Sequence, residues 1–185
     1  MRHETLLQRG ATALVLMDFQ EKILPAMAGA PEILARARIL AAGAIRLGLP
    51  VIATEQYPQG LGATVGGLKE VLPENQVVLA KKAFSAAQAD GFLPALTAAR
   101  APQVVLAGIE THICVLQTAL DLQIRGYQVH LALDACGSRA TANHANAAAR
   151  LQAAGVIITN VESVLFELLE IAEGEEFKAI SKLVR

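Results

Sequence analysis

The sequence predicts an α/β fold, a three-layer α/β/α sandwich built on a mainly parallel sheet of six strands. Apolar runs alternate with helical patterns along the chain, several helical patterns end in glycine, and 54% of residues are hydrophobic although only 4% are aromatic. A core of Ala, Val, Leu and Ile suits a sheet covered by helices. The length of 185 residues suits one core, so we expect a single domain over residues 1–185.

Six apolar runs have the length and composition of buried strands. They cover residues 11–18, 50–55, 76–80, 102–108, 127–134 and 155–160. Helical patterns occupy 31–47, 90–100, 112–125 and 141–154, and the acidic stretch 173–176 begins a C-terminal helix. Gly48, Gly126 and Gly155 each stand at a helix end just before a strand, which is typical of a glycine C′ residue. Right-handed crossovers between such strands give a parallel sheet with helices on both faces.

The charge pattern favours a small-molecule or protein partner. The 16 basic and 17 acidic residues give a net charge of −1 without a block of like charge, which indicates no nucleic-acid or anionic membrane surface. No apolar run approaches the ~20 residues that cross a bilayer, and the N-terminal stretch lacks the apolar centre of a secretory signal. We therefore expect a cytoplasmic protein.

The sequence shows no pattern typical of a cofactor or metal site. The stretch YPQGLGATVGG has Val65 where G-x-G-x-x-G needs its last glycine, and it is better explained as a loop over the site. The histidines are scattered, and the two cysteines form neither a C-x-x-C pair nor a zinc-type set. We expect no cofactor and no metal, a structural role for His130 in its strand, and a helix-surface position for His144.

Chemically active side chains follow three of the predicted strands. The first strand ends at Asp18, the third runs into Lys81 and Lys82, and the fourth runs into Cys114. Alone, these residues are typical of a turn cap, a solvated lysine and a packed thiol. Ligands of parallel sheets bind at the carboxyl ends of the strands, where the three groups would meet. Their joint placement predicts a catalytic carboxylate, ammonium and thiol.

The remaining strand ends supply candidates for substrate contact. Phe19 and Gln20 follow the first strand, and Gln56 and Tyr57 follow the second. We expect these four residues to line the substrate site. The fifth strand is expected to end at Asp134 on the same edge.

The two cysteines have different predicted surroundings. Cys114 lies at the start of a helix, where the helix dipole and a nearby lysine are expected to lower its pKa toward the thiolate. Free backbone N–H groups at that helix start would stabilise an oxyanion, unless Thr111 caps the helix and accepts the Cys114 N–H. Cys136 precedes Gly137 in a predicted turn, and we expect it to be structural.

Several stretches of the chain resemble a known family. They are LMDFQEKILPAM, TEQYPQGLG, KKAFSA, GIETHICVLQTALDLQIRGYQV and DACGSR. The chain is similar to the isochorismatase-like cysteine hydrolase superfamily, most closely to its isochorismatase domain-containing subfamily, from about Ala13 to the C-terminal helix. The resemblance implies the three-layer fold, a homo-oligomer (dimer or tetramer), and catalytic Asp18, Lys81 and Cys114. Lys81, and not Lys82, matches the family pattern K-x-x-F-S.

The resemblance also implies details of the backbone just before Cys114. It places a non-proline cis peptide bond at Ile109–Glu110 and an oxyanion hole at the amides of Glu110 and Cys114. Nicotinamidases of this superfamily carry an Asp-x-His metal motif where this chain has Glu55 to Tyr57, which argues against metal-dependent nicotinamidase activity. True isochorismatases lack the nucleophilic cysteine, so Cys114 favours acyl transfer from an amide or ureide.

These observations lead to one main hypothesis and two alternatives. The main hypothesis is a cofactor-free cysteine hydrolase that cleaves a C–N bond of a small amide or ureide through a thioester on Cys114. Asp18 would move the proton and Lys81 would hold Asp18 charged. The alternatives are a non-catalytic binding or scaffold protein with the same fold and a redox-active thiol protein.

Overall fold

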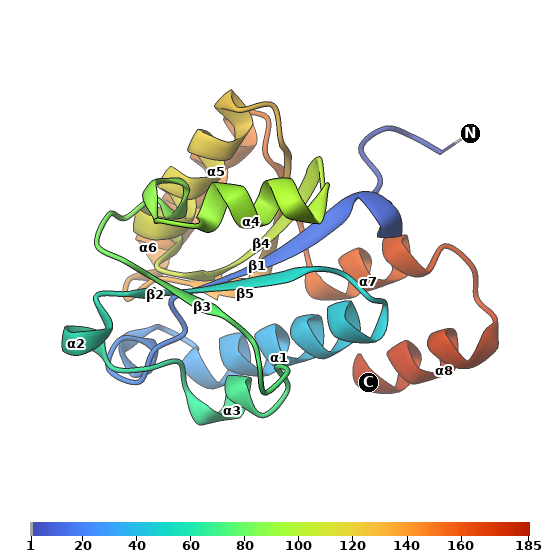
Figure 1. Ribbon diagram of the computed structural model, residues 1–185, viewed down its shortest axis with the longest axis horizontal. Helices are drawn as coiled ribbons and strands as arrows, with labels where there is room; N and C mark the ends of the chain where they lie inside the picture. Colours follow the sequence, from blue (N-terminus) through green and yellow to red (C-terminus); the bar gives the residue numbers. More distant parts are fainter. Residues whose placement is uncertain (1) are drawn as a thin grey trace.

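Six parallel strands form the central sheet of the computed structural model, which describes residues 2–185 (Figure 1). They are β1 (Thr12–Met17), β2 (Val51–Gln56), β3 (Val78–Lys81), β4 (Gln103–Ile109), β5 (Gln128–Gly137) and β6 (Ile157–Thr159). Their order is β3-β2-β1-β4-β5-β6, so the direction of winding reverses between β1 and β4. A ligand crevice forms at such a reversal, which places the ends of β1 and β4 at the centre of the expected site.

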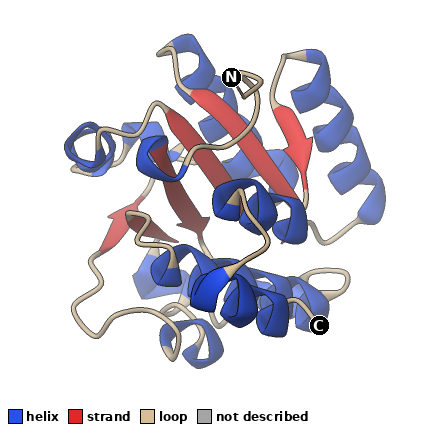
Figure 2. Cartoon of the chain, turned by 90° about the vertical axis from the view of Figure 1, so that its right-hand side faces the viewer, coloured by secondary structure: helices blue, strands red, loops and turns tan. Residues whose placement is uncertain are grey.

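Helices cover both faces of the sheet, as the sequence predicted. Figure 1 shows one layer above the sheet, made of α4 (Phe92–Ala99), α5 (Leu116–Ile124) and α6 (Thr141–Ala153). The layer below contains α1 (Ala30–Arg46), α3 (Gly66–Lys69), α7 (Val161–Leu169) and α8 (Gly174–Leu183), while α2 (Pro58–Leu61) follows β2. Figure 2, seen from the side, shows the strands enclosed between these two layers. The α/β/α sandwich is therefore confirmed.

Alternating side chains of the central strands fill two separate cores. In β1, Leu14 and Leu16 pack in the core between the sheet and the α1 and α7 layer. Val15 and Met17 pack in the core between the sheet and the layer of α4, α5 and α6. All six residues of β1 are buried, because a parallel strand covered on both faces has no solvent side. This burial explains why the strand reads as one continuous apolar run.

A close approach of β4 to β1 requires glycine at position 108. A Cβ atom there would lie 2.5 Å from the Met17 carbonyl oxygen, which is too close for any side chain. Gly108 therefore lets the ends of the two strands that carry Asp18 and Cys114 lie directly against each other.

The end of the fifth strand differs from the prediction. The fifth strand continues past Asp134 to Gly137, because the register shifts between Leu106 and Gly108 and brings Gly108 beside Cys136. Asp134 therefore lies inside β5, and its Oδ1 accepts the Val161 N–H at 2.9 Å at the start of α7. Asp134 serves that helix start and does not extend the catalytic edge.

The helix that carries Cys114 begins in an unexpected form. Residues Thr111–Val115 form one π-helical turn, and the regular helix α5 starts only at Leu116. The predicted continuous helix over 112–125 is thus divided in two. π-Helical turns within helices are frequent at functional sites.

Candidate active site

A buried ion pair lies where β1 ends. Asp18 directly follows β1 in a left-handed conformation (φ 59°), and its side chain is 1% exposed. The Lys81 Nζ atom, at the end of β3, lies 2.8 Å from Asp18 Oδ2. Thr54, in β2 between them, donates its hydroxyl to Asp18 Oδ1 at 2.8 Å. The ammonium and the hydroxyl supply polar partners to a carboxylate that would otherwise be costly to bury.

Lys81 and Lys82 occupy different environments. The Lys81 side chain is fully buried, and its Nζ also donates to Gln56 Oε1 at 2.6 Å and to the Phe84 carbonyl at 3.0 Å. Lys82 is exposed. Strand alternation explains the difference, since neighbouring residues point to opposite faces. The structure thus places Lys81, and not Lys82, beside Asp18.

Cys114 lies beside this ion pair, across the reversal point of the sheet. Its side chain comes from the π-helical turn after β4, is 6% exposed, and donates its thiol to Gln56 Oε1 at 3.9 Å. Burial, together with the smaller effect of the Asp18 charge, raises the pKa of the Cys114 thiol to about 12, although Lys81 acts in the opposite direction. The expected net lowering of this pKa is therefore wrong, although Lys81 acts in the predicted direction. At neutral pH the resting thiol is protonated, with a carboxylate at hand to accept its proton.

The backbone before Cys114 has the expected cis bond at Ile109–Glu110. Thr111 does not cap the helix, because its Oγ1 hydrogen-bonds with His144 Nδ1 at 2.9 Å. The expected position of His144 on an open helix surface is therefore wrong. Its ring is partly buried and contacts Thr111. His130 is buried, as expected.

Two of the four residues expected to contact substrate have buried side chains. The Phe19 side chain is 1% exposed and packs in the core beneath α1. Gln20 is fully buried, and its amide bonds the backbone of Gln56 and the Gly62 carbonyl. Phe19 therefore packs within the core, and Gln20 joins the end of β2 to the loop at Gly62. Position after a strand could not distinguish inward from outward side chains, because the chain turns sharply at Asp18.

Gln56 and Tyr57 remain at the edge of the site. The Gln56 amide lies between Lys81 and Cys114 and donates Nε2–H to the Lys82 carbonyl at 2.7 Å. Tyr57 is 51% exposed. Sequence inspection missed Thr54, although a polar residue just before the end of an apolar strand was a usable signal.

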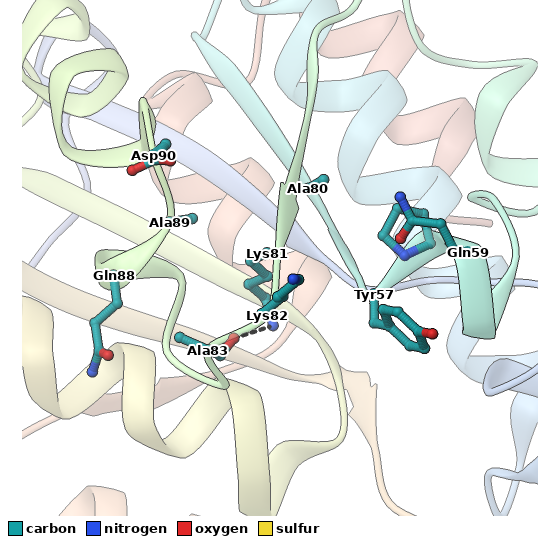
Figure 3. Close-up of a pocket in the computed structure, with 10 residues that line it drawn as sticks. Tyr57, Gln59, Ala80, Lys81, Lys82, Ala83, Gln88, Ala89 and Asp90 are labelled. Carbon is teal, nitrogen blue, oxygen red and sulfur yellow. Dashed lines mark hydrogen bonds between the residues drawn. The ribbon is translucent and has the colours of Figure 1, made fainter.

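A pocket of about 360 Å³ opens beside β3. Figure 3 shows Tyr57 and Gln59 on one side of it, Asp90 on the other, and Lys81 and Lys82 between them. Cys114 and Asp18 do not line this pocket. It borders the ion pair through Lys81 only, so the side-chain contacts, and not the cavity, locate the reactive groups.

Glu55 lies where nicotinamidases of the superfamily carry their metal motif, and its carboxylate is already bound by protein groups. Glu55 Oε1 accepts the backbone N–H of Thr64 at 2.6 Å and its hydroxyl at 2.7 Å. Within residues 2–185, no three His, Cys, Asp or Glu side chains are grouped as metal ligands. None of the helices in this part of the chain has the length and hydrophobicity of a membrane span.

Comparison with known proteins agrees with this architecture. The model of the isochorismatase domain matches residues 12–163. The chain belongs to the isochorismatase domain family. Isochorismatase domain-containing protein 1 of Danio rerio is 40% identical over 91% of the chain, which spans only 59% of that relative. Isochorismatase domain-containing protein 2 of Homo sapiens is 38% identical over 95% of the chain and 84% of the relative.

Solved structures share the whole fold. A structure described as MAR1 ribonuclease from Caenorhabditis elegans has a TM-score of 0.91 and 37% identity, covering 97% of this chain and 92% of that one. YcaC from Pseudomonas aeruginosa, described with hexane-2,5-diol and covalent acrylamide, has a TM-score of 0.91 and 27% identity, covering 99% and 93%. YcaC of Escherichia coli, an octameric hydrolase of unknown specificity, is 23% identical at a TM-score of 0.91 over 99% and 92%, which shows the fold alone.

Proposed function

We propose that this protein is a cysteine hydrolase that cleaves the C–N bond of a small amide or ureide through a thioester on Cys114. One observation carries the proposal. The Cys114 thiol lies in a buried site beside the Asp18 carboxylate, and the Nζ atom of the counter-ion Lys81 lies 2.8 Å from Asp18 Oδ2. A protonated thiol needs an adjacent base to become a nucleophile, and Asp18 is that base.

The first half of the reaction forms the acyl-enzyme. Asp18 takes the thiol proton while Sγ forms a bond to the substrate carbonyl carbon, and the carbonyl electron pair moves onto oxygen. The amides of Glu110 and Cys114 stabilise the resulting oxyanion. As the carbonyl re-forms, the C–N bond breaks, and Asp18 returns the proton to the leaving nitrogen.

The second half releases the acid. Water attacks the thioester, Asp18 accepts its proton, and the proton then returns to Sγ as the C–S bond breaks. Lys81, 2.8 Å from Asp18 Oδ2, serves as the counter-ion of this carboxylate through both halves of the reaction. No redox step or added co-reactant is required.

Covalent acrylamide in the P. aeruginosa neighbour supports a reactive nucleophile in this fold. Acrylamide is an electrophilic amide that adds to thiolates, and it is also small enough to model the proposed substrate class. This support reaches the present chain through 27% identity over 99% of its length.

RNA cleavage is a second candidate, because the C. elegans neighbour is named a ribonuclease. The present chain has a net charge of −1, and the buried Lys81 is already paired with Asp18. Neither feature favours a polyanionic substrate. Nucleotide release that persists in Cys114→Ser would favour RNA cleavage over amide hydrolysis.

The pH dependence of alkylation tests the proposal without a known substrate. We expect iodoacetamide to label Cys114 at a rate that is flat between pH 6 and pH 8, because Asp18 supplies the base throughout this range. A thiol with a pKa of about 12 and no base would react about tenfold faster for each pH unit. In Asp18→Asn the base is absent while burial still keeps the thiol protonated, so the flat profile should become a rise with pH, with a rate about 100-fold lower at pH 6. Mass mapping of the alkylated peptide provides the rates.

Three outcomes decide between the candidate functions. A flat profile that depends on Asp18, together with an acyl-enzyme trapped from an amide and ureide library, supports the hydrolase. Equal slow labelling of Cys114 and Cys136 contradicts it and favours a scaffold. Peroxide consumption with a sulfenic product favours a redox thiol.

Cytoplasmic location and homo-oligomerisation stay predictions, which fractionation and light scattering would check.

A further inference from the structure

Residues 110–112, between the end of β4 and Ile113, each use their side chain to contact one short segment. The Glu110 carboxylate accepts the Arg139 backbone N–H at 2.9 Å and the Arg139 Nε–H at 3.0 Å. The Thr111 hydroxyl hydrogen-bonds with His144 Nδ1 at 2.9 Å. We call residues 110–112 the nucleophile turn.

His112 completes the set. Its Nδ1 lies 3.0 Å from Ser138 Oγ, and its Nε2 lies 3.4 Å from Asn143 Nδ2. All the partners belong to residues 138–144, which join β5 to the first turn of α6 and which we call the tie segment. The nucleophile turn is therefore fixed from one side by a segment that follows a different strand.

The ion pair at the centre of this contact is largely shielded from water on one side. The Glu110 side chain is 3% exposed, whereas the Arg139 side chain is 63% exposed and covers it from outside. A buried carboxylate that accepts two N–H groups of one residue is geometrically well defined. Removing the guanidinium would leave that charge with only the backbone N–H and the more distant His112 ring, 3.9 Å away.

Glu110 in turn positions the nucleophile. Its carbonyl accepts the N–H groups of Ile113 at 3.0 Å and Val115 at 3.3 Å, so the π-helical turn that contains Cys114 is built on Glu110. A shift of Glu110 would move both the thiol and the backbone amides of the proposed oxyanion hole. Reaction rates are sensitive to displacements of about 1 Å at such positions.

We propose that Glu110 and Arg139 are positioning residues, and that the tie segment holds the nucleophile turn so that the Cys114 thiol faces Asp18. The inference rests on the proposed function, because it concerns the same thiol. Neither side chain touches the reacting atoms. Their effect passes through the backbone of the nucleophile turn.

The test measures iodoacetamide labelling of Cys114 in the full chain, with the melting temperature recorded for each variant. The variants are Arg139→Ala, Arg139→Lys and Glu110→Gln, each alone and combined with Asp18→Asn. Ser138→Ala and Thr111→Val remove single outer contacts and serve if the central variants do not fold. The matched control is Arg9→Ala, which breaks another two-contact Arg–Glu pair, with Glu176 at 2.7 and 3.0 Å, just before β1 and away from the site.

We expect Arg139→Ala and Glu110→Gln to label about tenfold more slowly than wild type, and Arg139→Lys to recover most of the rate. Ser138→Ala and Thr111→Val should slow labelling two- to fivefold. The decisive readout is coupling to Asp18. In Arg139→Ala or Glu110→Gln, adding Asp18→Asn should lower the rate much less than it does in wild type, because the thiol no longer faces the carboxylate. Arg9→Ala should change the melting temperature but keep the rate within twofold.

Other results would overturn the inference in distinguishable ways. If tie variants label as fast as wild type or faster, or slow only in proportion to their melting temperature as Arg9→Ala does, the pair stabilises the fold and positions nothing. An unchanged Asp18→Asn effect in Arg139→Ala has the same meaning. If wild-type labelling does not depend on Asp18 at all, the proposed function fails first.

Discussion

The two cysteines are buried to a similar extent but have different chemical surroundings. Cys114 is 6% exposed and Cys136 is 3% exposed, and burial raises the pKa of each thiol to about 12. Cys114 lies beside Asp18 and Lys81 at the ends of β1 and β3. Cys136 lies within β5, opposite Gly108, whose backbone N–H lowers the pKa of that thiol slightly against burial.

This comparison shows that a perturbed pKa does not by itself identify a nucleophile. Both thiols are protonated at neutral pH. Asp18 interacts with the Cys114 thiol through a side-chain hydrogen bond as well as through its charge, whereas Asp134 acts on Cys136 through its charge alone. The difference arises from topology, because β1, β3 and β4 each deliver one member of the set to the same edge. Three changes test this difference between the two sites: removal of the thiols, removal of the lysine, and replacement of a buried group of β5 that has no ionic partner.

Removal of the thiols should give the largest effect. Cys114→Ser should lower hydrolysis of any amide or ureide that the library identifies by about 10⁴-fold or more, because no thioester can form. Cys136→Ser should keep turnover within a fewfold of wild type, yet lower the free energy of unfolding by about 1–3 kcal/mol, because a hydroxyl replaces a buried thiol. Turnover and urea unfolding of both variants check this contrast. Comparable loss of turnover in Cys136→Ser without unfolding would contradict it.

The fold was more predictable than the site. Six apolar runs and the glycine-terminated helices sufficed for the sandwich, because strands covered on both faces are apolar throughout. The end of β5 was not predictable, since it depends on a register shift against Gly108. The π-helical turn at Thr111–Val115 was also missed, because its residues have ordinary helical periodicity.

Within the site, chain position predicted which groups gather but not their protonation. Asp18, Lys81 and Cys114 follow strands, so parallel topology brings them to one edge. The pKa of the thiol instead depends on burial and on the sum of one negative and one positive neighbour, which sequence does not provide. For the same reason Phe19 and Gln20 were assigned to substrate although both face inward.

Removal of the lysine should give the next largest effect. Lys81→Met leaves the Asp18 carboxylate buried without its counter-ion, so we expect a loss of about 3–5 kcal/mol in the free energy of unfolding. Lys82→Met is the matched control, because this neighbour is exposed and should change stability by less than about 0.5 kcal/mol. Urea unfolding measures both.

The double variant sharpens this result. Lys81→Met with Asp18→Asn removes both charges, so it should recover stability relative to Lys81→Met alone, while iodoacetamide labelling of Cys114 stays slow. Equal stability of Lys81→Met and Lys82→Met would show that Asp18 does not depend on the ion pair.

The smallest effect should come from His130, which shares β5 with Cys136 and is also buried without an ionic partner. Burial lowers the pKa of His130 to about 4, and its Nδ1 has no hydrogen-bond partner among residues 2–185. Between pH 6.5 and pH 4 the unfolded chain therefore binds a proton that the folded chain excludes, and stability must fall as the pH falls through this window. His130→Leu should flatten that fall, whereas His3→Leu, at an exposed position, should not. Urea unfolding at pH 7, 5.5 and 4.5 separates the two, and an unchanged slope in His130→Leu would mean that the protonated ring is accommodated within β5.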